Sequence, residues 1–116
     1  MSRDAMRKTL DRMVRRIVRQ FRPERIILFG SHARGQAGPD SDVDLLVVMP
    51  VEGSRREKAV EIGVALADVR VPKDIIVTTP ERYAWRREVV GTIEYPATRE
   101  GRLLYARSRR ARQRHS

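Results

Sequence analysis

Two aspartates that stand two residues apart at the start of an apolar run are the strongest chemical signal in this sequence. Asp42 and Asp44 lead into residues 45–48, a continuous apolar run typical of a buried strand. Because side chains at positions i and i+2 of a strand point to the same face, both carboxylates are expected to project together. Two such charges about 4 Å apart repel by roughly 4 kcal/mol at an effective dielectric of about 20. The pair therefore predicts a cation between the carboxylates, and their hard oxygen atoms favour Mg²⁺.

A turn of small residues precedes the acidic pair. The apolar run over residues 25–29 predicts a strand covered on both faces, which ends at Gly30-Ser31. A glycine-rich loop then leads to the aspartates, so the carboxylates are expected just across from backbone N–H groups that the turn leaves free. Together, the turn and the acidic pair predict a site for a metal ion and a triphosphate.

Two known motifs with similar spacing do not fit this sequence. Gly30 and Gly35 have the spacing of a P-loop, but Gln36 and Ala37 stand where Lys and Ser or Thr would be required. Phosphatases and glycosyltransferases with an Asp-x-Asp pair generally carry it after a hydrophobic strand, whereas this pair precedes one. A solvent-facing acidic turn would explain the aspartates alone, but not their combination with the glycine turn.

The motif Gly30-Ser31-x-x-Arg34-Gly35, followed by Ser41-Asp42-x-Asp44-Leu45, resembles the signature of the DNA polymerase β-type nucleotidyltransferase superfamily. The short chain looks like the minimal nucleotidyltransferase branch of that superfamily, which contains the antitoxin partners of HEPN-domain toxins. The resemblance is specific over residues 25–48 and weak at both ends of the chain. It implies an α/β (α+β) fold in which helices cover a small mixed β-sheet, as in polymerase β-like nucleotidyltransferases.

The resemblance also implies a reaction. AMP would move from ATP, the substrate, to an acceptor hydroxyl, with Mg²⁺ as cofactor and pyrophosphate as the second product. Asp42 and Asp44 would be catalytic ligands that bridge two Mg²⁺ ions. Asp74, which heads the next predicted strand, would hold the catalytic ion and accept the proton of the acceptor hydroxyl. The alternative for Asp74 is a solvated strand start after Pro72.

The loop before the acidic pair carries the residues that the resemblance assigns to the nucleotide. Gly30 and Ser31 would contact the terminal phosphates through backbone N–H groups and a hydroxyl, since only a small residue at position 30 lets phosphate approach. Arg34 would pair with phosphate oxygens, although a surface arginine bonded to carbonyls of its own loop explains it nearly as well. His32 receives no role. The preference for ATP rests on the resemblance alone, because the sequence contains no base-reading motif.

The length of 116 residues predicts a single nucleotidyltransferase domain over residues 1–106 and a basic, disordered tail at residues 107–116. Such a chain has no room for an acceptor-binding domain, so a partner or a second copy is expected to supply that surface. The resemblance favours a HEPN-domain protein as partner and acceptor, which would make the chain the antitoxin of a toxin–antitoxin pair. Two alternatives are a transferase for a small molecule such as an aminoglycoside and a non-catalytic module that neutralises its partner by docking.

The net charge of +10 is concentrated at the two ends of the chain. Basic ends often bind nucleic acid, but 22 of the 25 basic residues are arginine, which favours a GC-rich codon bias instead. Aromatic residues that could stack on bases are also scarce, so nucleic acid is a less favoured partner. The sequence has no apolar run of about 18 residues, which predicts that it spans no membrane. We expect a cytoplasmic protein, because the implied reaction needs ATP and Mg²⁺.

Apolar periodicity, helix caps and prolines predict the elements that must position these residues. Apolar residues at helical spacing predict an amphipathic first helix, and a capping box at Ser54–Glu57 opens the second. Tyr83 and Trp85 cannot both face inward from a helix that Thr79-Pro80 opens, so one is expected at the boundary. Pro96 is unusual inside the final helix, which is expected to be shorter or to begin there. The expected elements are a helix at 3–20, strands at 25–29 and 45–48, a helix from the capping box to 69, a strand at 71–78, a helix from 80, a helix at 92–100 and an extended segment at 103–105.

Overall fold

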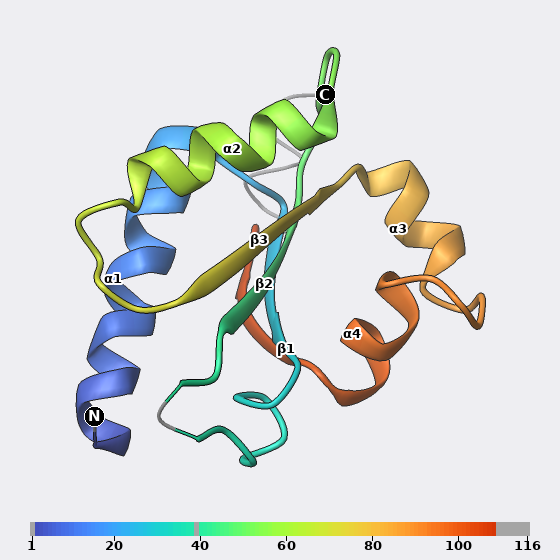
Figure 1. The fold of residues 1–116 in the computed structure, drawn as a ribbon. Coiled ribbons are helices and arrows are strands. Elements are labelled where there is room, and N and C mark those ends of the chain that lie inside the picture. Colours follow the sequence, from blue (N-terminus) through green and yellow to red (C-terminus); the bar gives the residue numbers. More distant parts are fainter. Residues whose placement is uncertain (1, 39, 109–116) are drawn as a thin grey trace.

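Four strands form one mixed sheet, and four helices lie against its two faces, within residues 2–38 and 40–108, which the computed structural model describes (Figure 1). This is the α+β architecture expected from the sequence. In order along the chain the elements are α1 (Arg3–Phe21), β1 (Arg25–Phe29), β2 (Val43–Val48), α2 (Arg55–Ala65), β3 (Lys73–Thr78), α3 (Pro80–Arg86), α4 (Glu94–Glu100) and β4 (Arg102–Ala106).

The order of the strands puts the two most apolar ones at the centre of the sheet. That order is β3-β2-β1-β4, in which β1 runs antiparallel to β2 and β4, whereas β2 and β3 are parallel. Both faces of β1 and β2 are covered, which explains their continuous apolar runs. In the described part of the chain, β3 and β4 form the edges of the sheet.

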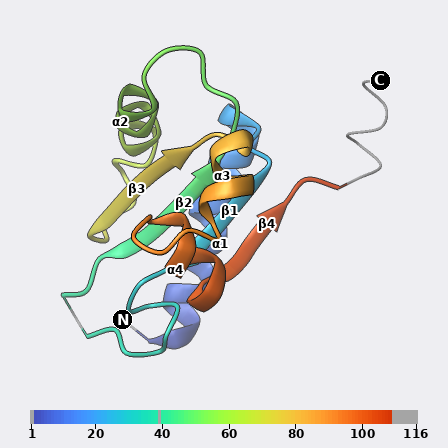
Figure 2. The same ribbon diagram turned by 90° about the vertical axis from the view of Figure 1, so that its right-hand side faces the viewer.

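Each face of the sheet has its own hydrophobic core. On one face, α1 contributes Met13 and α2 contributes Ile62 to a buried cluster that includes Leu45 of β2. On the other face, Tyr83 of α3 and Ala97 of α4 pack in a second cluster with alternate residues of β1 and β2. Figure 2 shows this arrangement, with α3 and α4 in front of the sheet and α1 behind it.

Side-chain caps fix where α2 and α3 begin. Ser54 Oγ accepts a hydrogen bond from the N–H of Glu57 at 3.1 Å, and Thr79 Oγ1 accepts one from the N–H of Arg82 at 3.3 Å. Each bond satisfies an N–H group that has no partner within the helix itself. The caps confirm the predicted starts of both helices.

Several predicted boundaries are wrong by a few residues; β2, for example, begins at Val43 rather than at 45. α2 ends at Ala65 rather than at 69, because Leu66 leaves helical geometry with φ −104° and ψ 11°. Val69 is nevertheless buried, as predicted. β3 begins at Lys73 rather than at 71, immediately after Pro72, which has no N–H to donate to a sheet.

The final helix and the two aromatic residues of α3 agree with the expected alternatives. α4 begins at Glu94 rather than at 92, and Pro96 lies in its first turn, where a missing N–H removes no helical hydrogen bond. Tyr83 is 7% exposed and Trp85 is 58% exposed, which confirms that only one of them faces inward.

The predicted tail lies largely outside the described residues. From residue 109 onward nothing of it is described, so the expected disorder of residues 107–116 and the domain boundary at 106 stay predictions. The backbone N–H of Arg107 donates to the carbonyl of Glu24 at 2.8 Å. None of the helices in the described part of the chain has the length and apolar character needed to cross a membrane.

Candidate active site

β2 places Asp44 on the face of the sheet that α3 and α4 cover. Its strand neighbours Val43 and Leu45 are buried in the core beneath α1 and α2, so Asp44 points to the opposite face. Asp42 lies two residues earlier, just before the strand, and is exposed. Because Asp42 precedes the strand, alternation does not fix its direction, but its negative charge acts on Asp44.

β3 brings a third carboxylate beside this pair. Asp74 is the second residue of β3 and pairs with Asp44 in the parallel register. Paired residues on adjacent strands, about 4.8 Å apart, extend their side chains from the same face. The register therefore places Asp74 beside Asp44. This favours a third carboxylate of the site over a solvated residue that only begins a strand.

The surroundings of Asp44 raise the pKa of its carboxyl group. Burial raises the pKa of Asp44 above its ordinary value, and the negative charges of Asp74 and Asp42 raise it further. The positive charges of His32 and Arg34 act in the opposite direction but leave the net shift upward. Burial and the neighbouring carboxylates therefore both disfavour the charged form of Asp44, which a bound cation would favour.

Gly30 is required by Asp44 itself. The pairing of Phe29 with Asp44 brings the end of β1 to the carboxylate. Gly30 has a φ of +74°, and a Cβ at this position would lie 2.2 Å from Oδ2 of Asp44. The sequence predicts a small residue here for the approach of phosphate, whereas the structure adds that the carboxylate lies directly against the glycine.

Several backbone N–H groups of the turn after β1 are already hydrogen-bonded within the turn. The N–H groups of Ala33 and Arg34 donate to the carbonyl of Gly30 at 3.1 and 3.2 Å, and the N–H of Gln36 donates to the carbonyl of Ser31 at 2.9 Å. Among the bonds between described residues, the N–H groups of Ser31 and His32 are not used in the turn. They are therefore the donors that this loop can offer to a phosphate.

Arg34 and His32 both make contacts within the protein. Arg34 is exposed, donates from Nε to the side-chain oxygen of Gln36 at 3.1 Å and lies 3.6 Å from Glu100, which agrees with the interpretation of a loop-bound surface arginine. Nε2 of His32 lies 3.2 Å from the carbonyl oxygen of Ser41 and so connects the two sides of the loop. No spacing signal in the sequence pointed to this contact, since the two residues meet only through the loop.

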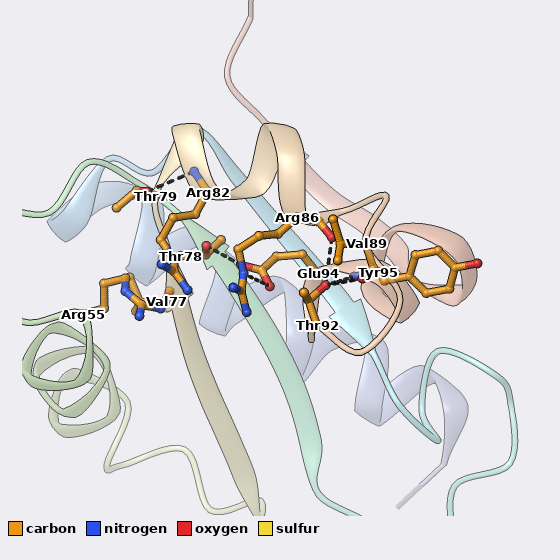
Figure 3. A network of polar contacts seen from close by, with 10 residues as sticks. All are labelled: Arg55, Val77, Thr78, Thr79, Arg82, Arg86, Val89, Thr92, Glu94 and Tyr95. Carbon is orange, nitrogen blue, oxygen red and sulfur yellow. Dashed lines mark hydrogen bonds and ion pairs between the residues drawn. The ribbon is translucent and has the colours of Figure 1, made fainter.

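A second carboxylate site, not predicted from the sequence, lies at the other end of β3 (Figure 3). Glu94 of α4 has a side chain that is 1% exposed, accepts a hydrogen bond from Oγ1 of Thr78 at 2.7 Å and pairs with Nε of Arg86 at 3.1 Å. Burial alone would raise the pKa of Glu94, but the bonds from Thr78 and Arg86 hold it below its ordinary value. The only available signal was a glutamate near a helix start, which most often is solvated.

The arrangement of side chains falls short of a complete metal cage. In residues 2–38 and 40–108, no three side chains of His, Cys, Asp or Glu lie close enough together to hold a metal ion. The predicted role of Asp42, Asp44 and Asp74 as metal ligands therefore stays a prediction.

Comparisons with known proteins point to one family. A family model of the nucleotidyltransferase domain matches residues 10–98. Among solved structures, a Sulfolobus solfataricus protein described as a nucleotidyltransferase aligns with a TM-score of 0.56 and 22% identity, over 88% of this chain and 81% of its own. A toxin–antitoxin complex with AMP-PNP aligns with a TM-score of 0.55 and 19% identity, over 89% of this chain and 78% of that chain. A mutant of the toxin–antitoxin MntA-HpeT aligns with a TM-score of 0.52 and 17% identity, over 90% and 77%.

These likenesses differ in what they establish. No curated protein gives a significant match to the chain. The solved structures are all below 25% identical to it and show the fold alone. The family match is of a different kind, because it extends over residues 10–98 and so includes the glycine turn and both acidic strands. The chain therefore belongs to the nucleotidyltransferase domain family.

Proposed function

We propose that this protein transfers AMP from ATP to a hydroxyl group of a protein acceptor and serves as the antitoxin of a toxin–antitoxin pair. The main support is the pairing of Asp44 with Asp74 on adjacent strands. This pairing lies next to Gly30, so the carboxylates stand beside a turn suited to phosphates. Membership of the nucleotidyltransferase family supports the reaction class. Two solved structures of similar fold are toxin–antitoxin complexes, one of them with AMP-PNP, which supports the role and the nucleotide.

Magnesium fits the donor chemistry of the acidic group. Asp42, Asp44 and Asp74 offer carboxylate oxygens, and the pKa of Asp44 is raised by burial and then by the neighbouring carboxylates, whose negative charge a divalent cation would offset. Mg²⁺ is usually held by one or two carboxylates together with substrate phosphates, so a complete protein cage is not required. Asp42, Asp44 and Asp74 are the residues that would hold the metal. When bound, Mg²⁺ would neutralise developing charge on the phosphates and the attacking oxygen.

The residues of the chain itself position the reactants and move the proton. Asp74 accepts the proton of the acceptor hydroxyl, whose oxygen forms a bond to the α-phosphorus. The bond from the α-phosphorus to the oxygen that bridges to the β-phosphate breaks, and pyrophosphate leaves with that oxygen. Gly30 and Ser31 hold the terminal phosphates through N–H groups and the Ser31 hydroxyl. Arg34 would join them only by exchanging its present side-chain contacts.

A HEPN-domain protein is the partner that we propose as acceptor. The motif resembles the minimal nucleotidyltransferases, whose partners are HEPN toxins, and the exposed arginines of α1 provide positive charge that would steer an acidic protein. If the partner is a ribonuclease, AMP on a hydroxyl near its active site would add negative charge where RNA phosphates must bind. That repulsion would persist after the antitoxin dissociates.

Intact-mass measurement tests this proposal directly. The chain is co-expressed with the product of its neighbouring gene, which we expect to be a short, all-helical HEPN protein with an Arg-x4-6-His motif. The partner is expected to gain mass in steps of one AMP, and the double variant Asp42→Asn, Asp44→Asn is expected to abolish these steps. A neutralised but unmodified partner would favour the docking-module alternative. Labelling of a small molecule such as an aminoglycoside, but of no protein, would favour the small-molecule alternative.

A further inference from the structure

We propose that the outer edge of β3, with the groove between it and the start of α2, binds an extended acidic segment of the acceptor protein as an added strand. This inference rests on the proposed function and specifies how the acceptor hydroxyl reaches Asp74. The evidence consists of the direction of the backbone groups of β3, the residues that line the groove and the position of the groove relative to Asp74.

Backbone hydrogen bonds fix which residues of β3 point outward. The carbonyls of Pro72 and Thr78 accept from Val43 and Met49 N–H groups and therefore face β2. Backbone groups alternate along a strand, so residues 72, 74, 76 and 78 face β2, and the intervening residues direct N–H and C=O groups away from the sheet. Consistent with this, the carbonyl of Val77 accepts a 3.5 Å hydrogen bond from the side chain of Arg55. Ile75 thus presents its N–H and carbonyl, and Val77 its N–H, to an added strand.

A groove with a volume of about 540 Å³ runs along this edge. Its strand side is formed by residues 75–77, and its other side by the loop and first turn of α2. Small side chains leave room for a polypeptide backbone on the α2 side. The residues that line the groove are Gly53, Ser54, Arg55, Arg56, Ala59, Ile75, Ile76 and Val77.

The charge of the groove selects an acidic occupant. Arg55 and Arg56 line it, and no acidic residue does. Arg82, in the first turn of α3 just after β3, has a buried Nε with no hydrogen-bond partner among the described residues. The capped start of α2 adds the positive end of a helix dipole. Arg86, in contrast, is already paired with Glu94.

These features favour a protein segment over the other possible occupants. A second copy of the chain would bring a net charge of +10 toward a groove that Arg55 and Arg56 already make positive, and like charges repel. A nucleic acid would find no aromatic side chain in the lining on which a base could stack. An extended peptide matches both the free backbone groups and the apolar side chains of the strand.

The groove begins next to the acidic group. Its first strand residue, Ile75, follows Asp74 directly. A residue of the added strand paired opposite Asp74 would lie about 4.8 Å away, with its side chain on the same face. A Ser, Thr or Tyr there would present its hydroxyl to Asp74, which accepts its proton as the oxygen bonds to the α-phosphorus and pyrophosphate leaves. Strand addition would therefore select which hydroxyl receives AMP.

Binding is tested with a defined probe, since the natural segment is unidentified. The probe is a pool of fluorescein-labelled nine-residue peptides in which Asp or Glu alternates with Val, Ile or Tyr. We expect saturable binding by fluorescence anisotropy. Amide hydrogen exchange measured by NMR is expected to slow at Ile75 and Val77 on binding, but to stay unchanged at Ile76 and Thr78, which face β2. A matched pool with Lys in place of the acids is expected not to bind.

Charge reversal locates the binding. The double variant Arg55→Glu, Arg56→Glu is expected to weaken binding of the acidic pool about tenfold. Arg99→Glu, Arg102→Glu, at exposed positions of α4 and of the opposite edge strand β4, makes the same change in net charge and is expected to leave binding unchanged. Equal weakening by both double variants, no saturable binding, or unchanged exchange at Ile75 and Val77 would overturn the inference. Tighter binding of single-stranded RNA at these amides, or self-association through them, would also overturn it.

The reaction is measured separately, so that the two proposals can fail separately. With ATP and Mg²⁺, Tyr-containing members of the bound pool are expected to gain AMP. Peptides that bind at the edge but gain no AMP would leave the docking surface standing and count against the proposed function. Transfer of AMP to peptides that do not slow exchange at Ile75 would support the function and overturn the docking surface.

Discussion

The two ends of β3 carry carboxylates in opposite electrostatic settings. At its start, Asp74 lies beside Asp44, where burial and neighbouring negative charge raise the pKa of Asp44. At its end, burial would also raise the pKa of Glu94, but hydrogen bonds from Thr78 and Arg86 reverse the shift. Burial disfavours a charged carboxylate at both ends, so the difference arises from the neighbouring groups.

This difference separates a site that stabilises the fold from one that needs a ligand. The charge of Glu94 is balanced by side chains of the same chain, and its bonds hold α3, α4 and β3 together. The charged form of Asp44 is disfavoured by burial and by its acidic neighbours. Of the two ends of β3, the start is therefore the one suited to a cation supplied from outside. The predictions below test this contrast.

The largest expected effect is the loss of transfer activity in Asp44→Asn. The change is nearly isosteric, so the fold is expected to persist, but one carboxylate charge that would hold the metal is removed. We expect a loss of roughly 4 kcal/mol of transition-state stabilisation, about a thousandfold in rate. The rate is measured with labelled ATP and the co-expressed partner. Retention of more than about a tenth of the wild-type rate would remove Asp44 from the site.

The next effect is stabilisation by metal and nucleotide. With Mn²⁺ and a non-hydrolysable ATP analogue at about 100 times Kd, binding to the folded state is expected to contribute about 2.7 kcal/mol, roughly 10 °C in melting temperature. Differential scanning calorimetry measures the shift, with Asp44→Asn as the variant expected to show little of it. Titration calorimetry that detects no heat above background would contradict the assignment of this end of β3 as a ligand site.

Glu94→Gln is expected to lower the free energy of unfolding by roughly 2 kcal/mol, because it leaves Arg86 and Thr78 without a buried anion to bond. Glu61→Gln, which removes an exposed pair with Lys58, serves as the control and is expected to cost less than about 0.5 kcal/mol. Urea unfolding near neutral pH gives both values. Equal effects of the two variants would show that Glu94 contributes no more than a surface pair.

The same variant has an expected pH dependence. The pKa of Glu94 lies below its ordinary value in the folded state. Its stabilising contribution is therefore present above the unfolded pKa and is lost as pH falls through the lowered folded value. The stability difference between wild type and Glu94→Gln is expected to shrink in acid. A difference that grows in acid would contradict the sign of this shift.

The smallest effect is the stability of Asp44→Asn without ligand. Because the pKa of Asp44 is raised in the folded state, folding disfavours its charged form. The resulting loss of stability is absent at pH values below the pKa of the unfolded state and complete at pH values above the pKa of the folded state. Without metal, the variant is expected to be more stable than wild type near neutral pH, by less than about 1 kcal/mol. The advantage is expected to disappear in acid. Urea unfolding in chelator at several pH values would contradict this if the variant were the less stable protein near neutral pH.

Local sequence signals predicted most of the elements. Ser54 and Thr79 cap helices where expected, and the strand at residues 25–29 has its predicted limits, because caps, prolines and apolar periodicity act over a few residues. The errors lie at the ends of elements, such as the end of α2 at Ala65, after which Leu66 leaves helical geometry. The existence of an acidic pair beside a glycine turn was likewise readable, since both are local motifs.

What the sequence by itself determined is the chemistry available at Gly30, Asp42 and Asp44, which are close along the chain. Only the tertiary structure decided that Asp74 stands in register with Asp44, that a side chain at position 30 would collide with Asp44, and that Glu94 is buried against Thr78. These contacts join residues far apart in the sequence or depend on the pairing of strands. Their energies come from burial and from the charges of neighbours, which exist only after the sheet has formed.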